Sequence, residues 1–141
     1  MRFMIIVKAT AESEGETHPA PEEALLAEMA DYHEQLVKAG VLLDASGLKP
    51  SSQGWRVRYD GDKRTVIDGP FAETKELIAG YTLIEVRSHD EALAWAQRFP
   101  APFPGQPCCI EVRPLMGGID LPPEDAERVI REQLAAIKRG G

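Results

Sequence analysis

His33 is the side chain in this 141-residue sequence whose type and position best suit proton transfer. It follows Met29 by about one helical turn, at the edge of an apolar helix stripe, and Tyr32 stands beside it. An imidazole in this position can act as a general base. The alternative is a partly buried histidine that only hydrogen-bonds a carbonyl group. His18, in a polar loop, and His89, in the first turn of a helix, are expected to face solvent.

Asp68 is the carboxylate candidate for a second proton carrier. It opens the run Asp-Gly-Pro-Phe-Ala-Glu-Thr-Lys-Glu at residues 68–76. The alternative is structural, because an Asp before Gly-Pro forms a turn by accepting backbone N–H bonds. In that interpretation Gly69 supplies backbone freedom, Pro70 stiffens the exit and Phe71 fills an apolar gap.

Further charged side chains are candidates for binding a substrate, namely Glu73, Lys75, Arg56, Arg58 and Arg113. A turn does not require the polar residues Glu73 and Lys75, which favours salt bridges to a neighbour or a place on a pocket rim. Arg56 and Arg58 share one face of an expected strand, and two guanidiniums can hold an anionic substrate. The alternative is a solvated hairpin face.

Composition excludes several classes of function. The net charge of −7 and the pI near 5.0 disfavour binding to nucleic acid or to anionic membrane surfaces. Cys108 and Cys109 are adjacent and form no zinc-binding pattern, so we expect two reduced structural thiols in a cytoplasmic protein. No clustered metal ligands, glycine-rich nucleotide loop or stretch of transmembrane length occurs, so we expect no cofactor, metal or membrane partner.

The pattern of apolar residues predicts the elements that must position these side chains. Strands are expected at residues 2–8, 41–48, 55–59, 64–67, 80–86 and 108–113, helices at 21–40, 88–99 and 122–139, and a mobile polar loop at 9–20. The order β-α-β, hairpin, β-α-β predicts an α+β fold of the ferredoxin-like, split βαβ type with an extra hairpin and an appended C-terminal helix.

The two faces of the expected sheet differ in polarity. One face is apolar, with Phe3, Ile5, Val7, Ile84, Val86, Cys108, Ile110 and Val112. The other is mixed, with Met4, Ile6, Lys8, Tyr81, Leu83, Glu85, Cys109, Glu111 and Arg113. Helices in this architecture cover only one face, and the mixed face is too apolar to be left in water. We therefore expect a homodimer that stacks sheet on sheet around a polar-rimmed pocket. The alternative is that the charged members form a solvated half-face.

The run at residues 68–76 resembles the signature of the DGPF-domain proteins, within the YCII-related superfamily. The likeness extends to Val66-Ile67, Gly80-Tyr81, Gly40-Val41, Gly47-Leu48 and residues 111–114. It implies a YCII-related DGPF domain at residues 1–115, with the fold of a ferredoxin-like dimeric α/β barrel, and a helical extension at residues 116–141.

The resemblance leaves two functional hypotheses open, and with them the question of whether the protein is an enzyme. YCII-related proteins resemble enzymes that act on small aromatic or lactone-like compounds with a His and Asp pair. In the first hypothesis a dimer pocket binds a small molecule, His33 and Asp68 carry protons without a cofactor, and Arg56 or Arg58 orients an anion. Some DGPF members are encoded beside extracytoplasmic-function sigma factors. In the second hypothesis the protein is therefore a non-catalytic binding or regulatory protein that docks such a partner.

Overall fold

The structure, a computed structural model, describes residues 1–15, 23–116 and 123–140, with the backbone alone at residues 123–126 and 138–140. Its elements in chain order are β1 (Arg2–Lys8), α1 (Ala11–Glu14), α2 (Glu23–Lys38), β2 (Leu42–Gly47), β3 (Trp55–Asp60), β4 (Lys63–Asp68), β5 (Ile78–Glu85), α3 (His89–Gln97), β6 (Ile110–Pro114) and α4 (Pro123–Gly140). The helix starts predicted at Pro21 and Pro122, and the solvent-facing position of His18, lie outside the described residues.

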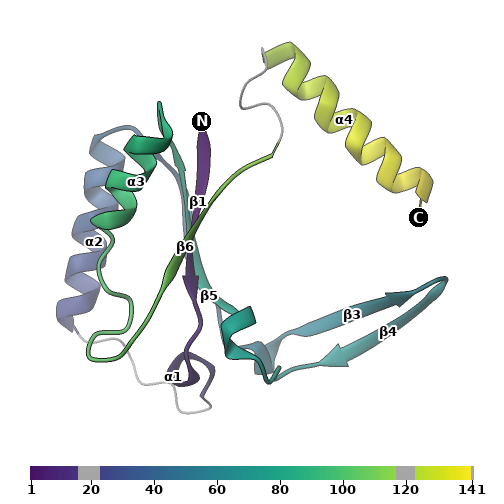
Figure 1. Ribbon diagram of the computed structural model, residues 1–141, viewed down its shortest axis with the longest axis horizontal. Helices are drawn as coiled ribbons and strands as arrows, with labels where there is room; N and C mark the ends of the chain where they lie inside the picture. Colours follow the sequence, from purple (N-terminus) through teal and green to yellow (C-terminus); the bar gives the residue numbers. More distant parts are fainter. Residues whose placement is uncertain (16–22, 117–122, 141) are drawn as a thin grey trace.

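Four strands form an antiparallel sheet in the order β2-β5-β1-β6. The connections β1-α2-β2 and β5-α3-β6 place both long helices of the body on one face of this sheet (Figure 1). The predicted α+β class, with mixed helices and an antiparallel sheet, is confirmed.

The core lies between that face and the two helices. Phe3, Ile5 and Ile84 from the sheet pack with Leu36 and Tyr32 of α2, and all are at most 3% exposed. These strand residues are on the face predicted to be apolar, because alternate side chains of a strand point to the same side.

The closing strand begins later than predicted. β6 starts at Ile110, and the thiols of Cys108 and Cys109 are free and exposed, so Cys108 is not part of the apolar face. The ladder with β1 ends at the pair Val7 and Ile110. The chain nevertheless approaches β1 at this point, where the Lys8 N–H donates to the Cys109 carbonyl at 3.1 Å.

The opposite side of the sheet, here called the open face, carries Met4, Ile6, Lys8, Tyr81, Leu83, Glu85, Glu111 and Arg113. The apolar members among them are half-buried and Glu85 is exposed. No helix of the described residues packs against this face in Figure 1, where α2 and α3 lie on the far side. The open face therefore has the mixed character that the alternation predicted.

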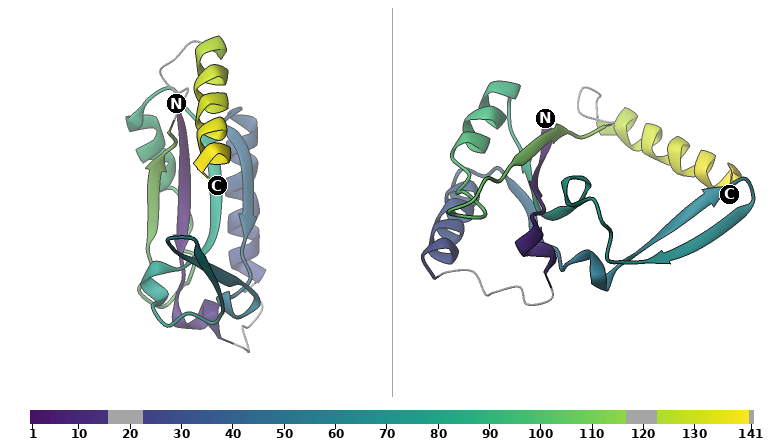
Figure 2. Two further views of the ribbon diagram at one scale, coloured as in Figure 1. Left: turned by 90° about the vertical axis from the view of Figure 1, so that its right-hand side faces the viewer. Right: turned by 60° about the horizontal axis from the view of Figure 1, so that its bottom comes forward.

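The hairpin β3–β4 forms a separate two-stranded sheet, here called the arm (residues 55–68). Its two strands were predicted, and its turn contains Gly61 with a positive φ of 59°. The arm projects away from the four-stranded sheet, on the side opposite α2 and α3 (Figures 1 and 2). Every residue of both strands is exposed.

The segment predicted as an irregular loop at residues 9–20 contains a one-turn helix, α1, in its described part. Its cause is a reciprocal cap: the Thr10 hydroxyl accepts from the Ser13 N–H at 3.2 Å, and the Ser13 hydroxyl accepts from the Thr10 N–H at 2.9 Å. Within the described ranges, no helix has the length and apolar content needed to cross a membrane.

Candidate functional site

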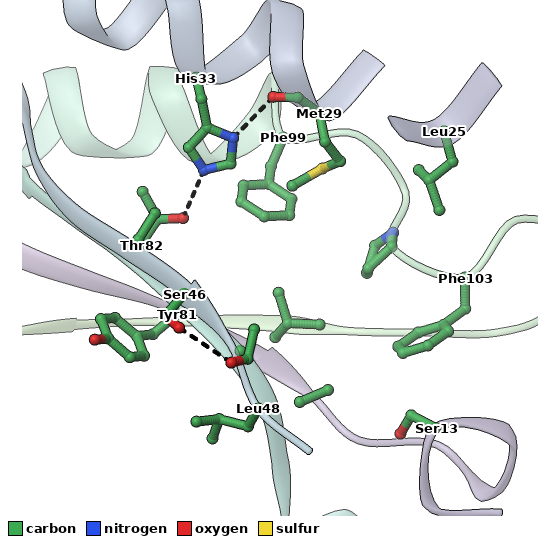
Figure 3. Close-up of a pocket in the computed structure, with 16 residues that line it drawn as sticks. Ser13, Leu25, Met29, His33, Ser46, Leu48, Tyr81, Thr82, Phe99 and Phe103 are labelled. Carbon is green, nitrogen blue, oxygen red and sulfur yellow. Dashed lines mark hydrogen bonds between the residues drawn. The ribbon is translucent and has the colours of Figure 1, made fainter. Parts of the chain in front are cut away.

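A cavity of about 430 Å³ lies between α2 and the ends of β2 and β5 (Figure 3). The segment between α3 and β6 closes a further side with Pro102 and Phe103. Its volume lies within the range of small-molecule sites, which is roughly 300–1,000 Å³.

The floor of the cavity exists because small residues interrupt the apolar side of β5. On the side where Ile84 fills the core, the next two positions are Thr82 and Gly80. Gly80 pairs with Gly47 of β2, so two strands meet there without side chains. A Cβ on Gly80 would lie 3.0 Å from the Ser46 carbonyl oxygen, so the strands approach each other closely. The missing side-chain volume becomes the space between sheet and helix.

The roof and walls are apolar and aromatic. Leu25, Met29 and His33 line the cavity from successive turns of α2, because residues four apart share one helix face. Phe99 and Phe103 add two aromatic walls, and Figure 3 shows both rings at the cavity. No carboxylate, lysine, arginine or cysteine occurs among the described residues that line it.

His33 is held by both ring nitrogens. Nδ1 lies 2.8 Å from the Met29 carbonyl oxygen, and Nε2 lies 3.2 Å from the Thr82 hydroxyl (Figure 3). Because a carbonyl only accepts, Nδ1 must carry the proton, and neutral Nε2 then offers its lone pair to the Thr82 hydroxyl. His33 thus combines both predicted features, a hydrogen bond to a carbonyl group and a place in a cavity. Its catalytic role stays a prediction.

Tyr32 supports this histidine from the core side. Its ring meets the His33 ring edge-on with centroids 5.7 Å apart, and its hydroxyl donates to the Trp95 carbonyl at 2.8 Å. Burial raises the pKa of Tyr32 to about 12, against a smaller lowering by the Arg98 guanidinium. The phenol therefore keeps its proton at neutral pH and serves as packing and anchor.

Asp68 is placed elsewhere. It is the last residue of the arm, exposed, and it pairs with Trp55 across the two strands. It is not among the residues that line the His33 cavity, so the single chain does not bring the two together there.

The residues after Asp68 fasten the base of the arm. A Cβ on Gly69 would overlap the Ser51 carbonyl oxygen and lie 2.7 Å from its carbon, so this position excludes any side chain. The Gly69 N–H donates to the Gly54 carbonyl at 3.0 Å, and the Phe71 N–H donates to the Ser51 hydroxyl at 3.1 Å. Glycine is thus required here by close backbone approach, in addition to the backbone freedom that we expected from it. The Gly69–Pro70 peptide bond is cis.

Glu14 ties α1 to the same point. Its carboxylate accepts from the Ser51 N–H at 2.8 Å and from the Ser51 hydroxyl. The neighbouring Ser13 lines the His33 cavity. The wall of the cavity and the base of the arm are therefore joined through two consecutive residues of α1.

The remaining charged candidates are dispersed. Arg56 lies over the Phe71 ring at 3.8 Å from its centroid, and Arg58 is exposed on the arm. Glu73 is exposed beside the base of the arm, and Arg113 pairs with Glu111 of its own strand at 3.3 Å. Cation–π contact with an aromatic ring accounts for the position of the Arg56 guanidinium in the single chain.

Lys75 lines a second cavity of about 420 Å³, with Lys8, Cys108 and Cys109. Both thiols are exposed, and the lining of this open recess at the end of β1 is mainly apolar. In the described part of the chain, no group of three or more His, Cys, Asp or Glu side chains is arranged to hold a metal ion.

Sequence reasoning missed the residues that form the cavity with His33, namely Leu25, Met29, Thr82, Phe99 and Phe103. A signal was present in β5, where glycine and threonine replace large apolar residues on the side that faces the helices. Phe103 had no signal, because it lies in a proline-rich segment without periodicity.

A family model described as the YCII-related domain matches residues 1–116. The chain belongs to the YCII-related family. This YCII-related chain is 35% identical over 94 residues to an uncharacterized protein of Rhizobium meliloti (strain 1021), a match that covers 67% of this chain and 75% of that protein. The predicted relationship is thus confirmed for the YCII-related family, and the narrower DGPF assignment and the division into residues 1–115 and 116–141 stay predictions.

Among solved structures, the YCII-related chain is similar to 5-chloro-2-hydroxyhydroquinone dehydrochlorinase from Burkholderia phenoliruptrix AC1100, solved in complex with 2,5-dihydroxybenzoquinone. The TM-score is 0.40 and the identity 16%, over 84% of this chain and 96% of the other. A likeness at this level carries no argument about the chemistry of the chain.

Proposed function

We propose that this YCII-related protein binds a small, flat, largely apolar molecule in the His33 cavity and that His33 exchanges a proton with it. The observation that carries the proposal is the His33 ring, whose Nε2 faces Thr82 inside a cavity walled by Phe99 and Phe103. Aromatic walls favour a flat ligand through offset or edge-on ring contacts.

The proposed proton transfer uses groups already in place. Nδ1–H stays bonded to the Met29 carbonyl, which fixes the ring orientation and leaves Nε2 as the base. The ligand would first displace the Thr82 O–H from the Nε2 lone pair. Its hydroxyl, or a C–H next to a carbonyl, would then give its proton to Nε2 and become an anion, while His33 becomes an imidazolium. The Thr82 hydroxyl would then turn to accept from Nε2–H. Asp68 does not line the cavity of the single chain, so the proposal gives this step to His33 alone.

The predicted role of Arg56 and Arg58 in orienting an anion is a separate proposal. Both belong to the arm, and neither lines the His33 cavity of their own chain. They would therefore have to reach a ligand from a second chain. The same condition applies to Glu73 and Arg113, whereas Lys75 has its own recess beside Lys8.

We also propose the finer architecture. The strand order β2-β5-β1-β6, with β1 in contact with both β5 and β6, supports a ferredoxin-like fold. The half-apolar open face supports stacking of two such sheets into a dimeric α/β barrel. The acidic chain and its two free thiols support a cytoplasmic location.

The binding proposal is tested by titrating the full chain with catechol, hydroquinone, benzoate and cyclohexanone, observed by amide NMR shifts. We expect the aromatic probes to shift the amides of Gly80, Thr82 and Phe103, and His33→Gln to weaken binding of the best probe by about 10-fold, as for the loss of one hydrogen bond. His89→Gln is the matched control, because His89 is exposed and does not line the cavity. Equal binding by His33→Gln and the wild type would refute the role of His33.

A further inference from the structure

One face of the arm is richer in apolar side chains than the other. Cross-strand pairing places Trp55 opposite Asp68, Val57 opposite Val66 and Tyr59 opposite Arg64. Trp55, Val57, Tyr59 and Val66 therefore share a side, here called the apolar arm face, with Arg64 and Asp68 at its two ends. Trp55, Tyr59 and Val66 are 66%, 66% and 65% exposed, and Val57 is 37% exposed.

Among the described residues of its own chain, nothing covers the apolar arm face, because all four of its apolar members are exposed. An isolated two-stranded hairpin is marginally stable in water, because it has no third layer to cover its apolar residues. The arm is nevertheless held at a fixed base by Gly69, Phe71 and Ser51, as described above. A fastened projection that exposes a tryptophan and a tyrosine is suited to a partner surface, since these residues dominate interface energetics.

We propose that the apolar arm face docks on a second copy of this chain, with each copy receiving the arm of the other. This inference rests on the homodimer proposed above and adds that the exchanged arms hold its two copies together. In Figure 1 the arm leaves the body on the side opposite α2 and α3, which is the side of the open face. A two-fold arrangement that stacks the open faces would therefore bring each arm alongside the sheet of the other copy.

The available area suits a stable dimer. With Trp55 and Tyr59 about two-thirds exposed, and Val57 and Val66 beside them, one apolar arm face offers on the order of 400 Å². Two arms and the two patches that they cover would bury about 1,600 Å², the size of a standard specific interface. Because two-fold symmetry repeats the contact, the interface has twice the area that a single arm would bury, which would be small for a stable complex.

Charge favours a copy of the same chain over an unrelated partner. Residues 55–68 contain four basic side chains (Arg56, Arg58, Lys63, Arg64) and three acidic ones (Asp60, Asp62, Asp68), a net charge of +1. The whole chain carries −7, so the remainder carries −8. The arm is weakly basic and the rest of the chain is acidic, so the arm of one copy is attracted to the body of another.

The decisive comparison uses Val66→Asp and Thr65→Asp in the full chain. The two positions are adjacent in β4 and both exposed, but only Val66 lies on the apolar arm face. Sedimentation velocity from about 1 to 100 µM should show a wild-type dimer and a loss of affinity of about 100-fold or more for Val66→Asp, because a buried interface would receive an unpaired charge. Thr65→Asp should remain within about threefold of the wild type, as surface substitutions do. Equal melting temperatures of the two variants in dilute solution, where both are monomeric, would show that the body is intact in both.

A second readout reports directly on the arm. The chain has two tryptophans, so Trp95→Phe leaves Trp55 as the sole emitter. Dilution below the dimer dissociation constant should shift the Trp55 emission to longer wavelength, since the indole passes from the interface into water. Emission typical of exposed indole at all concentrations would overturn the proposal.

The outcomes separate this inference from the earlier proposals. A wild-type chain that is monomeric at about 100 µM overturns both the homodimer and the docking of the arm. If the wild type is a dimer, and Val66→Asp is also a dimer with unchanged Trp55 emission, the docking of the arm is overturned. The proposed stacking of the sheets then stands. The binding of aromatic probes to the His33 cavity is measured independently and decides only the proposed function.

Discussion

Both ring nitrogens of His33 are hydrogen-bonded, Nδ1 to the Met29 carbonyl of its own helix and Nε2 to the Thr82 hydroxyl of the sheet. The first bond has a spacing of four residues, so any histidine in this helix position could form it. The second needs the sheet and the helix to be assembled. Folding therefore supplies the feature that distinguishes His33 from a histidine in an isolated helix, which is an oriented Nε2 inside a cavity.

The tautomer of His33 follows from these contacts. We expect the neutral ring to carry its proton on Nδ1, and a long-range ¹H–¹⁵N correlation spectrum of histidine-labelled protein would show it. His33→Gln assigns the signal among the three histidines of the chain. Thr82→Val should leave the tautomer unchanged, because the bond to the Met29 carbonyl remains. Predominance of the Nε2–H form would contradict the proposed base.

Gly69 is the glycine at which an added methyl group should destabilise the fold most. Gly69→Ala drives a Cβ into the Ser51 backbone, so we expect a loss of roughly 2–3 kcal/mol in the free energy of unfolding, or release of the arm base. Gly54→Ala, at the other strand's end of the arm base, is the control, because its Cβ would meet the Ser51 oxygen at an ordinary 3.7 Å. Urea denaturation and amide exchange at Phe71 measure the two effects, and similar values for both variants would argue against the steric explanation.

At the scale of single residues, prediction from sequence succeeded where the local pattern determines the contact. His33 was expected at the edge of an apolar helix stripe, and it lies there, with its ring bonded to a carbonyl. Thr82 and Phe103 were missed, because their meeting with His33 depends on the distance between layers. The strength of the Gly69 requirement was underestimated for the same reason: the atom that excludes a side chain belongs to Ser51, far back in the chain.

Tyr32 links α2 to α3 through its bond to the Trp95 carbonyl, and its ring also contacts Phe99, just after α3, at 5.1 Å between centroids. The phenol is 3% exposed, so ionisation would place a charge in the core of this helix pair. The contact between the helices is therefore sensitive to high pH.

The pH dependence follows from the pKa of Tyr32, raised from 10.0 to about 12. Between these values the unfolded chain releases the Tyr32 proton while the folded chain retains it, so the stability present below pH 10 falls as pH rises towards 12. The loss should be on the order of 2–3 kcal/mol. Because other groups titrate in this range, the measurement is the difference between wild-type and Tyr32→Phe denaturation curves. Parallel curves would show that Tyr32 does not titrate as expected.

The elements themselves were largely predictable. Alternation located β1 and β5, and helical spacing located α2 and α3, because each of these elements has one buried side. α1 was missed, since four residues are too few for an apolar period and its cap pairs Thr10 with Ser13 instead of a glutamate or glutamine. β6 was placed two residues too early, because apolar cysteines continued the pattern beyond the region that pairs.

For the whole molecule, the predicted division near residue 116 leads to a testable prediction about α4. The described apolar side chains Ile130, Leu134 and Ile137 are 48%, 55% and 69% exposed, so α4 contributes little burial to the body. A chain ending at residue 116 should melt within about 2 °C of the full chain in dilute solution, where association is absent. A decrease of several degrees would show that α4 is part of the same folding unit.

The arrangement of the elements in the whole molecule was the feature least predictable from the sequence. The alternation in residues 55–59 and 64–67 is the same whether a hairpin folds back on its own sheet or projects from it, so sequence predicted the hairpin but not the projection. The polarity of the open face was predicted, because it depends only on the period of the strands. The partner that covers such faces is determined by a second molecule, which no local pattern encodes.

The two consecutive residues Ser13 and Glu14 have a consequence for how this protein would respond to its own abundance. Ser13 lines the His33 cavity, and the Glu14 carboxylate accepts a hydrogen bond from the Ser51 N–H at the base of the arm. If capture of an arm reshapes that wall, association and ligand binding become linked equilibria, each changing the other by the same factor. The chain would then act as its own effector, with a ligand affinity that depends on protein concentration.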